Sequence, residues 1–331
     1  MANYNLSSLI NLEIFVPYRC TNNCPYCISK DFYERKNYNF KNFINKLKKL
    51  NKLQIISYYK LTGGEPIDNF EYFKQIVDNS ERQISIYTSL PLKDNLLDII
   101  MFINDNNKII KVVISYHNHE DFLSKINYIQ RIKKYIQINK VVNEDTTNEE
   151  LDLFFNDIKY LNNVDFINIR YDFTQNNDVN NSNLVFDYLN NNFDKEVSDC
   201  SKCNLYSQNI CRKHIFNINE DLQIEYNIIN NFNNTNNFSN KIILKPDSTL
   251  SYSIIQDDEN FENDLLNNNF ENPYIIKTSD NKFVNYYHGY IYFDENTYTE
   301  INTQIELDYI TNYLNSHNIE NYELLEQIPN K

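Results

Sequence analysis

The feature that most constrains the fold is a regular alternation of two hydrophobic periods. Segments typical of strands, such as residues 11–18 and 109–116, alternate with segments whose apolar residues recur every three or four positions, such as 40–50. Six strand–helix pairs follow one another between about residues 10 and 190. This order predicts a parallel sheet with right-handed crossovers. Six pairs are too few for a closed eight-fold barrel, so a doubly wound sheet and an open three-quarter barrel both fit the pattern.

The alternation stops near residue 195, and we expect residues 195–331 to form a second, α+β unit. Short strands and turns replace the long helices there. The segment around Asp247 and residues 282–293 both have the pattern of a hairpin. A Thr-x-x-Glu capping box that begins at Thr303 predicts a final helix.

Composition limits the classes of function. The chain has 331 residues and a formal net charge of −14, which disfavours a nucleic-acid partner because phosphate contacts need a basic surface. No stretch approaches the roughly 20 apolar residues that span a bilayer. The N-terminus lacks the basic start and apolar run of a signal peptide. We therefore expect a cytoplasmic, reducing location without a membrane, where clustered cysteines bind metal or take part in catalysis more often than they form disulfides.

Three of the six cysteines lie within eight residues of one another. Cys20, Cys24 and Cys27 have the spacing C-x3-C-x2-C and follow the first predicted strand directly. In an α/β barrel the loop after a strand opens on the face where chemistry is done. Three thiolates on one loop can bind three irons of a cubane cluster and leave the fourth iron open. Half of a zinc site and buried structural cysteines are the alternatives, but neither explains three cysteines at this spacing.

A second motif, GGEP, follows the second predicted strand. Gly63 and Gly64 are two of only three glycines in the chain, so their adjacency indicates a positive φ or a close approach of backbone to a ligand. Glu65 places a carboxylate beside this backbone. A simple tight turn would also explain the motif if it stood alone.

The two motifs together resemble the radical S-adenosylmethionine (radical SAM) superfamily, over roughly residues 10–190. The resemblance implies an open (βα)6 three-quarter TIM barrel. It implies that Cys20, Cys24 and Cys27 hold a [4Fe–4S] cluster whose open iron chelates S-adenosylmethionine. It also implies a set of residues that contact this cofactor: Tyr26 near the adenine, Gly63, Gly64 and Glu65 at the methionine amino group, and Thr88, Ser89, Ser115 and Arg170 at the ends of later strands. Thr88-Ser89 stands where Thr-Asn-Gly is more common, so this part of the assignment departs from the family pattern.

The activity that the resemblance implies is reductive cleavage of S-adenosylmethionine to methionine and a 5′-deoxyadenosyl radical. The radical would take a hydrogen atom from the substrate, which is a ribosomally made peptide in many similar enzymes and a nucleoside, sugar or other small metabolite in others. An external electron donor of the flavodoxin or ferredoxin type would be a partner. A non-catalytic protein that binds iron–sulfur or S-adenosylmethionine is the rival from another class.

The remaining cysteines form a second group, with the spacing C-x2-C-x7-C: Cys200, Cys203 and Cys211. With His214 they would make a Cys3His set that suits a structural zinc. The alternative is a second, auxiliary [4Fe–4S] cluster, in an extension that resembles a shortened SPASM or twitch unit. We favour the cluster over zinc, and either metal over bare thiols.

Two histidines follow the fourth predicted strand. His117 and His119 come directly after Ser115 and Tyr116. They would face the substrate in one interpretation and solvent in the other, and the sequence favours neither.

Overall fold

The computed structural model describes most of the first 250 residues and isolated strands beyond them. The described residues are 5–18, 20, 22, 24, 27, 38–52, 56–143, 145–171, 182–196, 211–218, 222–229, 238–251, 274–278, 283–287, 290–294, 297–300 and 322–325. Tyr26, Cys200 and Cys203 lie outside the described residues. The predicted final helix from Thr303 lies outside them as well.

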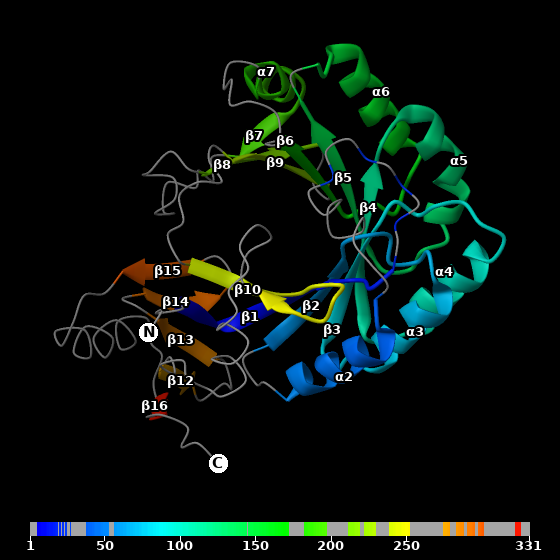
Figure 1. The fold of residues 1–331 in the computed structure, drawn as a ribbon. Helices are drawn as coiled ribbons and strands as arrows, with labels where there is room; N and C mark the ends of the chain where they lie inside the picture. Colours follow the sequence, from blue (N-terminus) through cyan, green and yellow to red (C-terminus); the bar gives the residue numbers. More distant parts are fainter. Residues whose placement is uncertain are drawn as a thin grey trace.

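Six strands and six helices alternate in the first part of the chain, as predicted (Figure 1). The strands are β1 (Asn5–Phe15), β2 (Ile56–Thr62), β3 (Gln83–Thr88), β4 (Ile109–Tyr116), β5 (Tyr135–Val142) and β6 (Phe166–Tyr171). The helices are α2 (Phe40–Asn51), α3 (Phe70–Asp78), α4 (Leu96–Asp105), α5 (His119–Ile129), α6 (Asn148–Lys159) and α7 (Ser182–Asn192).

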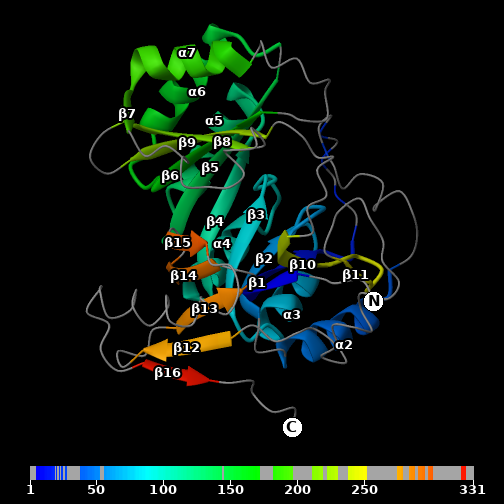
Figure 2. The same cartoon turned by 90° about the vertical axis from the view of Figure 1, so that its left-hand side faces the viewer.

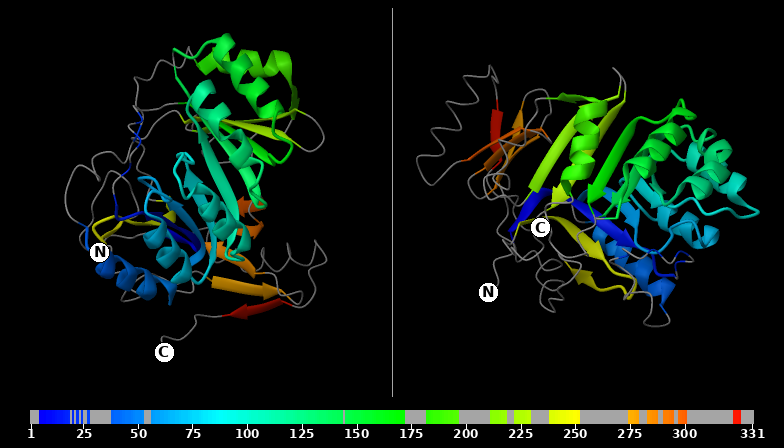
Figure 3. Two further views of the ribbon diagram at one scale, coloured as in Figure 1. Left: turned by 90° about the vertical axis from the view of Figure 1, so that its right-hand side faces the viewer. Right: turned by 90° about the horizontal axis from the view of Figure 1, so that it is seen from above.

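The six strands pair in sequence order and every neighbouring pair is parallel. The helices form an arc along the outer face of the curved sheet, as Figures 1 and 3 show from different sides. This consecutive order confirms the open partial barrel, because a doubly wound sheet would reverse its strand order at a switch point.

The second half of the chain extends this sheet at both edges. On one edge β9 (Gln223–Ile229) lies parallel to β6, followed by the antiparallel β8 (Cys211–Asn217) and β7 (Asp194–Glu196). On the other edge β10 (Phe238–Leu244) lies parallel to β1 and forms the predicted hairpin with β11 (Leu250–Ser251). β1 begins at Asn5, earlier than the predicted residue 11, and its first residues pair with β10.

Five further strands form a separate antiparallel sheet, which Figure 2 shows beside the β1 end of the barrel. They are β12 (Tyr274–Thr278), β13 (Phe283–Tyr287), β14 (Tyr290–Asp294), β15 (Thr297–Glu300) and β16 (Tyr322–Leu325). The β13–β14 pair is the hairpin predicted within residues 282–293. The predicted division into two units at about residue 195 stays a prediction. The strands β8 to β11 come after this boundary in the sequence, but they belong to the same sheet as β1 to β6.

The two faces of the large sheet differ in polarity. The face under the helices is apolar and buried, with Leu12, Leu61, Ile86 and Ile138 among its fully buried residues. The concave face carries polar side chains that follow one another across the strands. Two runs in cross-strand register are Glu13–Lys60–Ser85–Lys111 and Ser115–Asn139–Asn168–Glu225. A TIM barrel usually packs its interior with branched apolar side chains, so this polar lining departs from that of a closed barrel.

Helix α6 is fixed to the sheet by a buried carboxylate. Asp157 is 1% exposed and accepts hydrogen bonds from Tyr116 Oη at 2.7 Å and from His119 Nδ1 at 2.8 Å. The ring of Tyr116, at the end of β4, also packs edge-on against Phe154 of α6. The network therefore ties α6 to the end of β4 and to the start of α5.

Replacing Asp157 with alanine should lower the free energy of unfolding by about 2–4 kcal/mol, because the buried hydroxyl of Tyr116 and the partly exposed imidazole of His119 lose their acceptor. Asp152→Ala is the matched control. Asp152 lies on the same helix and accepts from Tyr188 Oη at 2.6 Å, but it is exposed, so its loss should cost under about 1 kcal/mol. Chemical denaturation of both variants measures the difference, and equal losses would contradict the structural role given to Asp157.

Among the residues that the structure describes, no helix is long and apolar enough to cross a membrane.

Candidate functional site

The first cysteine group lies where β1 ends. Cys20, Cys24 and Cys27 are thiols rather than half-cystines, and each is half-buried. The amide of Cys27 donates to the carbonyl of Cys24 at 3.2 Å, so a turn holds these two residues together. Tyr18, just before the loop, donates its hydroxyl to the carbonyl of Pro66 in the GGEP loop. The two motifs are therefore neighbours in space, as the resemblance implied.

Three thiols on one loop are a donor set that could hold a cubane cluster. Within the described part of the chain, no three ligating side chains converge as one metal ion would require. A cubane differs, because each cysteine binds a separate iron. Burial raises the pKa of Cys20 to about 12 and also raises the pKa of Cys24. Both thiols would have to deprotonate to bind a cationic centre.

The GGEP loop needs its glycines. Gly63 and Gly64 have φ values of 63° and 42°, in the left-handed region where a Cβ atom is disfavoured. The pair follows β2 directly, so its backbone is presented at the same end of the sheet as the cysteine loop. This confirms the backbone requirement that the sequence indicated.

Glu65 is held by the protein itself. Its carboxylate is 1% exposed and accepts four hydrogen bonds. One oxygen accepts from Thr88 Oγ1 at 2.5 Å and from the amide of Ile67 at 3.3 Å. The other accepts from the amide and the hydroxyl of Ser89, both at 2.8 Å. Thr88 and Ser89, which the resemblance implied as contacts of the cofactor, here hold the Glu65 carboxylate, and this carboxylate links the GGEP loop to the end of β3.

Ser89 connects four segments of the site. Besides its bonds to Glu65, its hydroxyl accepts from Asn22 Nδ2 at 2.6 Å, within the cysteine loop. Its carbonyl accepts from Lys125 Nζ at 2.9 Å, and Lys125 is buried on α5 beside Asp121. Sequence reasoning did not single out Asn22 or Lys125, and only their contacts with Ser89 identify them.

Leu90 completes the turn after β3 in an uncommon conformation. Its φ is 53°, a value that favours glycine, and its side chain is fully buried. The amide of Leu90 donates to Thr88 Oγ1 at 2.8 Å, which helps to hold the turn. A glycine at this position, as in Thr-Asn-Gly, would adopt such a φ without a steric penalty.

Two other predicted cofactor contacts lie on the concave face. Ser115 belongs to the polar run of β4 to β9 and is half-buried. Arg170, near the end of β6, is exposed and close enough to Tyr87 of β3 to offset part of the rise that burial causes in the pKa of that tyrosine. Both positions open toward the interior of the barrel.

The two histidines after β4 have different surroundings. His117 Nε2 lies 3.7 Å from Cys24 Sγ, so it faces the cysteine loop. His119 Nδ1 instead donates to the buried carboxylate of Asp157 on α6 at 2.8 Å. The structure thus separates two residues that the sequence could not distinguish.

The second cysteine group is described only at Cys211 and His214, and only in backbone. Both lie on β8, three positions apart. Successive strand residues alternate between faces, so these two positions belong to opposite faces of the strand.

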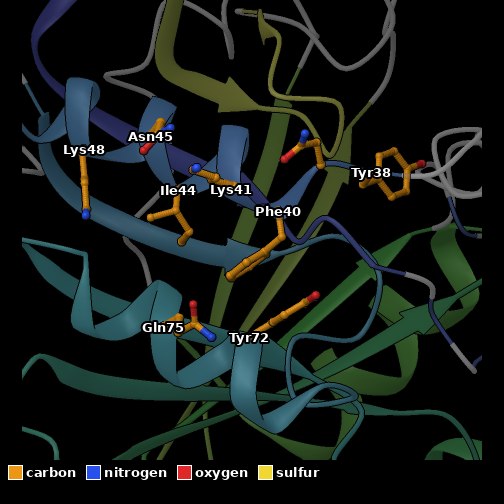
Figure 4. Close-up of a pocket in the computed structure, with 9 residues that line it drawn as sticks. Tyr38, Phe40, Lys41, Ile44, Asn45, Lys48, Tyr72 and Gln75 are labelled. Atoms are coloured by element: carbon orange, nitrogen blue, oxygen red, sulfur yellow. The ribbon is translucent and has the colours of Figure 1, made fainter.

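A groove of about 800 Å³ lies outside this site, between α2 and α3 (Figure 4). The rings of Phe40 and Tyr72 stack there with their centroids 3.8 Å apart. Lys41 and Lys48 of α2 also line the groove. None of its nine lining residues is a predicted site residue.

The buried carboxylate of Glu65 should make stability depend on pH. Burial raises its pKa above the ordinary 4.5, while the hydrogen bonds of Thr88, Ser89 and Ile67 act in the opposite direction. The folded protein then keeps this proton to higher pH than the unfolded chain, so the free energy of unfolding falls as pH rises from about 4.5 through the raised pKa.

The difference in unfolding free energy between the native protein and Glu65→Gln should therefore shrink across that range, by about 1.4 kcal/mol for each unit of raised pKa. Denaturation curves at several pH values measure it. A difference that stays constant or grows with pH would contradict the raised pKa.

Comparison with solved structures confirms the fold. Crystal structures of SuiB from Streptococcus suis match with TM-scores of 0.54 for the form bound to precursor peptide SuiA and 0.52 for the form bound to S-adenosylmethionine. The identities are 15% for both, over 81% and 82% of this chain and 66% and 68% of the SuiB chains. In the alignment with the peptide-bound form, this chain spans 66% of the SuiB chain, which is just under two thirds of its length. No protein-family model matches the sequence. No curated protein is similar enough to match either.

Proposed function

We propose that this protein is a radical S-adenosylmethionine enzyme that acts on a peptide. The observation that carries the proposal is the hydrogen-bonded junction of the two motifs. Asn22, between Cys20 and Cys24, bonds to Ser89, and Ser89 bonds to Glu65 of the GGEP loop. Three cysteines beside a left-handed Gly-Gly backbone, at the C-terminal ends of parallel strands, form the arrangement that a cluster and its chelated cofactor need.

The residues of this chain would divide the work as follows. Cys20, Cys24 and Cys27 hold a [4Fe–4S] cluster, and Gly63 and Gly64 present backbone to the methionine amino group of the cofactor. Glu65 keeps that backbone in place through Thr88 and Ser89. Ser115 and Arg170 contact the ribose and carboxylate from the concave face. When bound, the cluster supplies the electron that cleaves S-adenosylmethionine to methionine and a 5′-deoxyadenosyl radical, which takes a hydrogen atom from the substrate.

A peptide is the favoured substrate because SuiB has been crystallised with a precursor peptide and shares the barrel fold. The polar concave face supports a ligand with many hydrogen-bonding groups. A small metabolite is the alternative substrate. The electron would come from a flavodoxin or ferredoxin type donor.

We further propose that Cys200, Cys203 and Cys211 bind an auxiliary [4Fe–4S] cluster. The spacing of the three cysteines supports this, and a Cys3His zinc site completed by His214 is the alternative. Metal and sulfide analysis of the reconstituted protein tests it: about eight irons are expected from two clusters of four. About four irons with one zinc would overturn the second cluster and leave the first.

The test of the main proposal is formation of 5′-deoxyadenosine. Anaerobically reconstituted protein with dithionite and S-adenosylmethionine should release 5′-deoxyadenosine and methionine, measured by liquid chromatography. A protein with a full cluster that binds S-adenosylmethionine but never cleaves it would support the rival, a non-catalytic binding protein.

A further inference from the structure

The contact between His117 and Cys24 joins the cysteine loop to the end of β4. His117 directly follows β4, and its Nε2 lies 3.7 Å from Cys24 Sγ, within hydrogen-bonding range for sulfur. His117 is half-buried, and so is Cys24. The imidazole can donate an N–H to this sulfur, because neutral histidine carries one donor nitrogen and the tautomer is chosen by its partners.

The loop has a second tether on a different strand. Asn22 bonds to Ser89 after β3, at 2.6 Å. The loop is thus fixed on one side to the β3 turn by an amide–hydroxyl bond and on the other to β4 through a thiol. Only the contact between His117 and Cys24 involves an atom that would bind iron.

A hydrogen-bond donor at a sulfur ligand changes the reduction potential of an iron–sulfur cluster. Reduction adds one negative charge, which spreads over the irons and their sulfur ligands. A hydrogen bond to a thiolate sulfur stabilises the more negative state, and such bonds are among the factors that set the potentials of iron–sulfur clusters.

We propose that His117 donates an N–H···S hydrogen bond to the Cys24 thiolate and raises the reduction potential of the cluster. The inference rests on the proposed function. In the step concerned, the cluster takes one electron from the external donor and passes from the 2+ to the 1+ state, while His117 keeps its proton. His117 is a positioning residue for this step, because it acts through Cys24 and not on the substrate.

The test compares variants of three kinds in the full-length, reconstituted protein. His117→Ala removes the donor, and His117→Gln restores an N–H at similar reach. His119→Ala is the matched control, two residues further on, because His119 bonds to Asp157 and not to a thiol. The midpoint potential of the cluster at Cys20, Cys24 and Cys27 is measured by an EPR-monitored redox titration without S-adenosylmethionine, with every protein in a Cys211→Ala background to remove the signal of the proposed second cluster. The signal comes only from cluster-loaded molecules, so a variant that loads poorly still yields a potential.

We expect a midpoint potential in His117→Ala that is more negative than in the native protein, beyond the scatter of replicate titrations. His117→Gln should return toward the native value, and His119→Ala should match it. Equal potentials in native protein and His117→Ala would overturn this inference alone. A native protein that assembles no [4Fe–4S] cluster would overturn the proposed function, and this inference with it.

Discussion

Replacing Cys24 with alanine should reduce the formation of 5′-deoxyadenosine to the level measured without enzyme. The physical reason is the number of ligands: three thiolates hold three irons of the cubane, and two leave a second iron without a protein ligand. Cys24 Sγ is also the atom that His117 Nε2 contacts at 3.7 Å, so the substitution removes that contact as well. Product analysis, with iron content and the visible absorption of the cluster, measures the effect.

Cys211→Ala is the matched control, since it removes a cysteine of the second group. It should lower the iron content of the protein but still allow 5′-deoxyadenosine to form, because the first three cysteines remain. Wild-type product levels in Cys24→Ala, or equal loss in both variants, would contradict the separate roles of the two groups.

Replacing Glu65 with alanine should lower 5′-deoxyadenosine formation by about 10- to 100-fold while the cluster still assembles, an effect typical of residues that orient a metal site from the second layer. The carboxylate accepts four hydrogen bonds in a fully buried position. Its removal leaves several donors without an acceptor, at about 1–3 kcal/mol each. The Gly63-Gly64 backbone then loses its link to β3, so the cofactor should bind more weakly.

The matched control is Glu71→Ala on α3. Glu71 is exposed and pairs with Lys74 at 2.6 Å, so its loss should change stability by less than about 1 kcal/mol and leave product formation unchanged. The titration of S-adenosylmethionine binding by each loaded variant separates weaker binding from slower chemistry. Native affinity in Glu65→Ala would show that the GGEP loop does not depend on this anchor.

Local sequence patterns sufficed for the elements of the barrel. Apolar periodicity identified all six strands and six helices of the first part, because each buries one face against the same layer and its neighbours lie close in sequence. The edges were not predictable in this way. β9 and β10 join the sheet from more than 50 residues away, and nothing in their own sequences states which edge they extend.

The sequence by itself determined which residue types meet at the site: three thiols, a Gly-Gly pair and a glutamate, each just after a strand. Parallel strands end at the same edge, so these groups had to gather there. Only the tertiary structure decided what each one touches. In the structure, Glu65 accepts hydrogen bonds from Thr88 and Ser89. Asn22 and Lys125 both bond to Ser89. His117 contacts Cys24, whereas His119 bonds to Asp157. These contacts depend on side-chain directions across loops from different strands, which spacing along the chain does not encode.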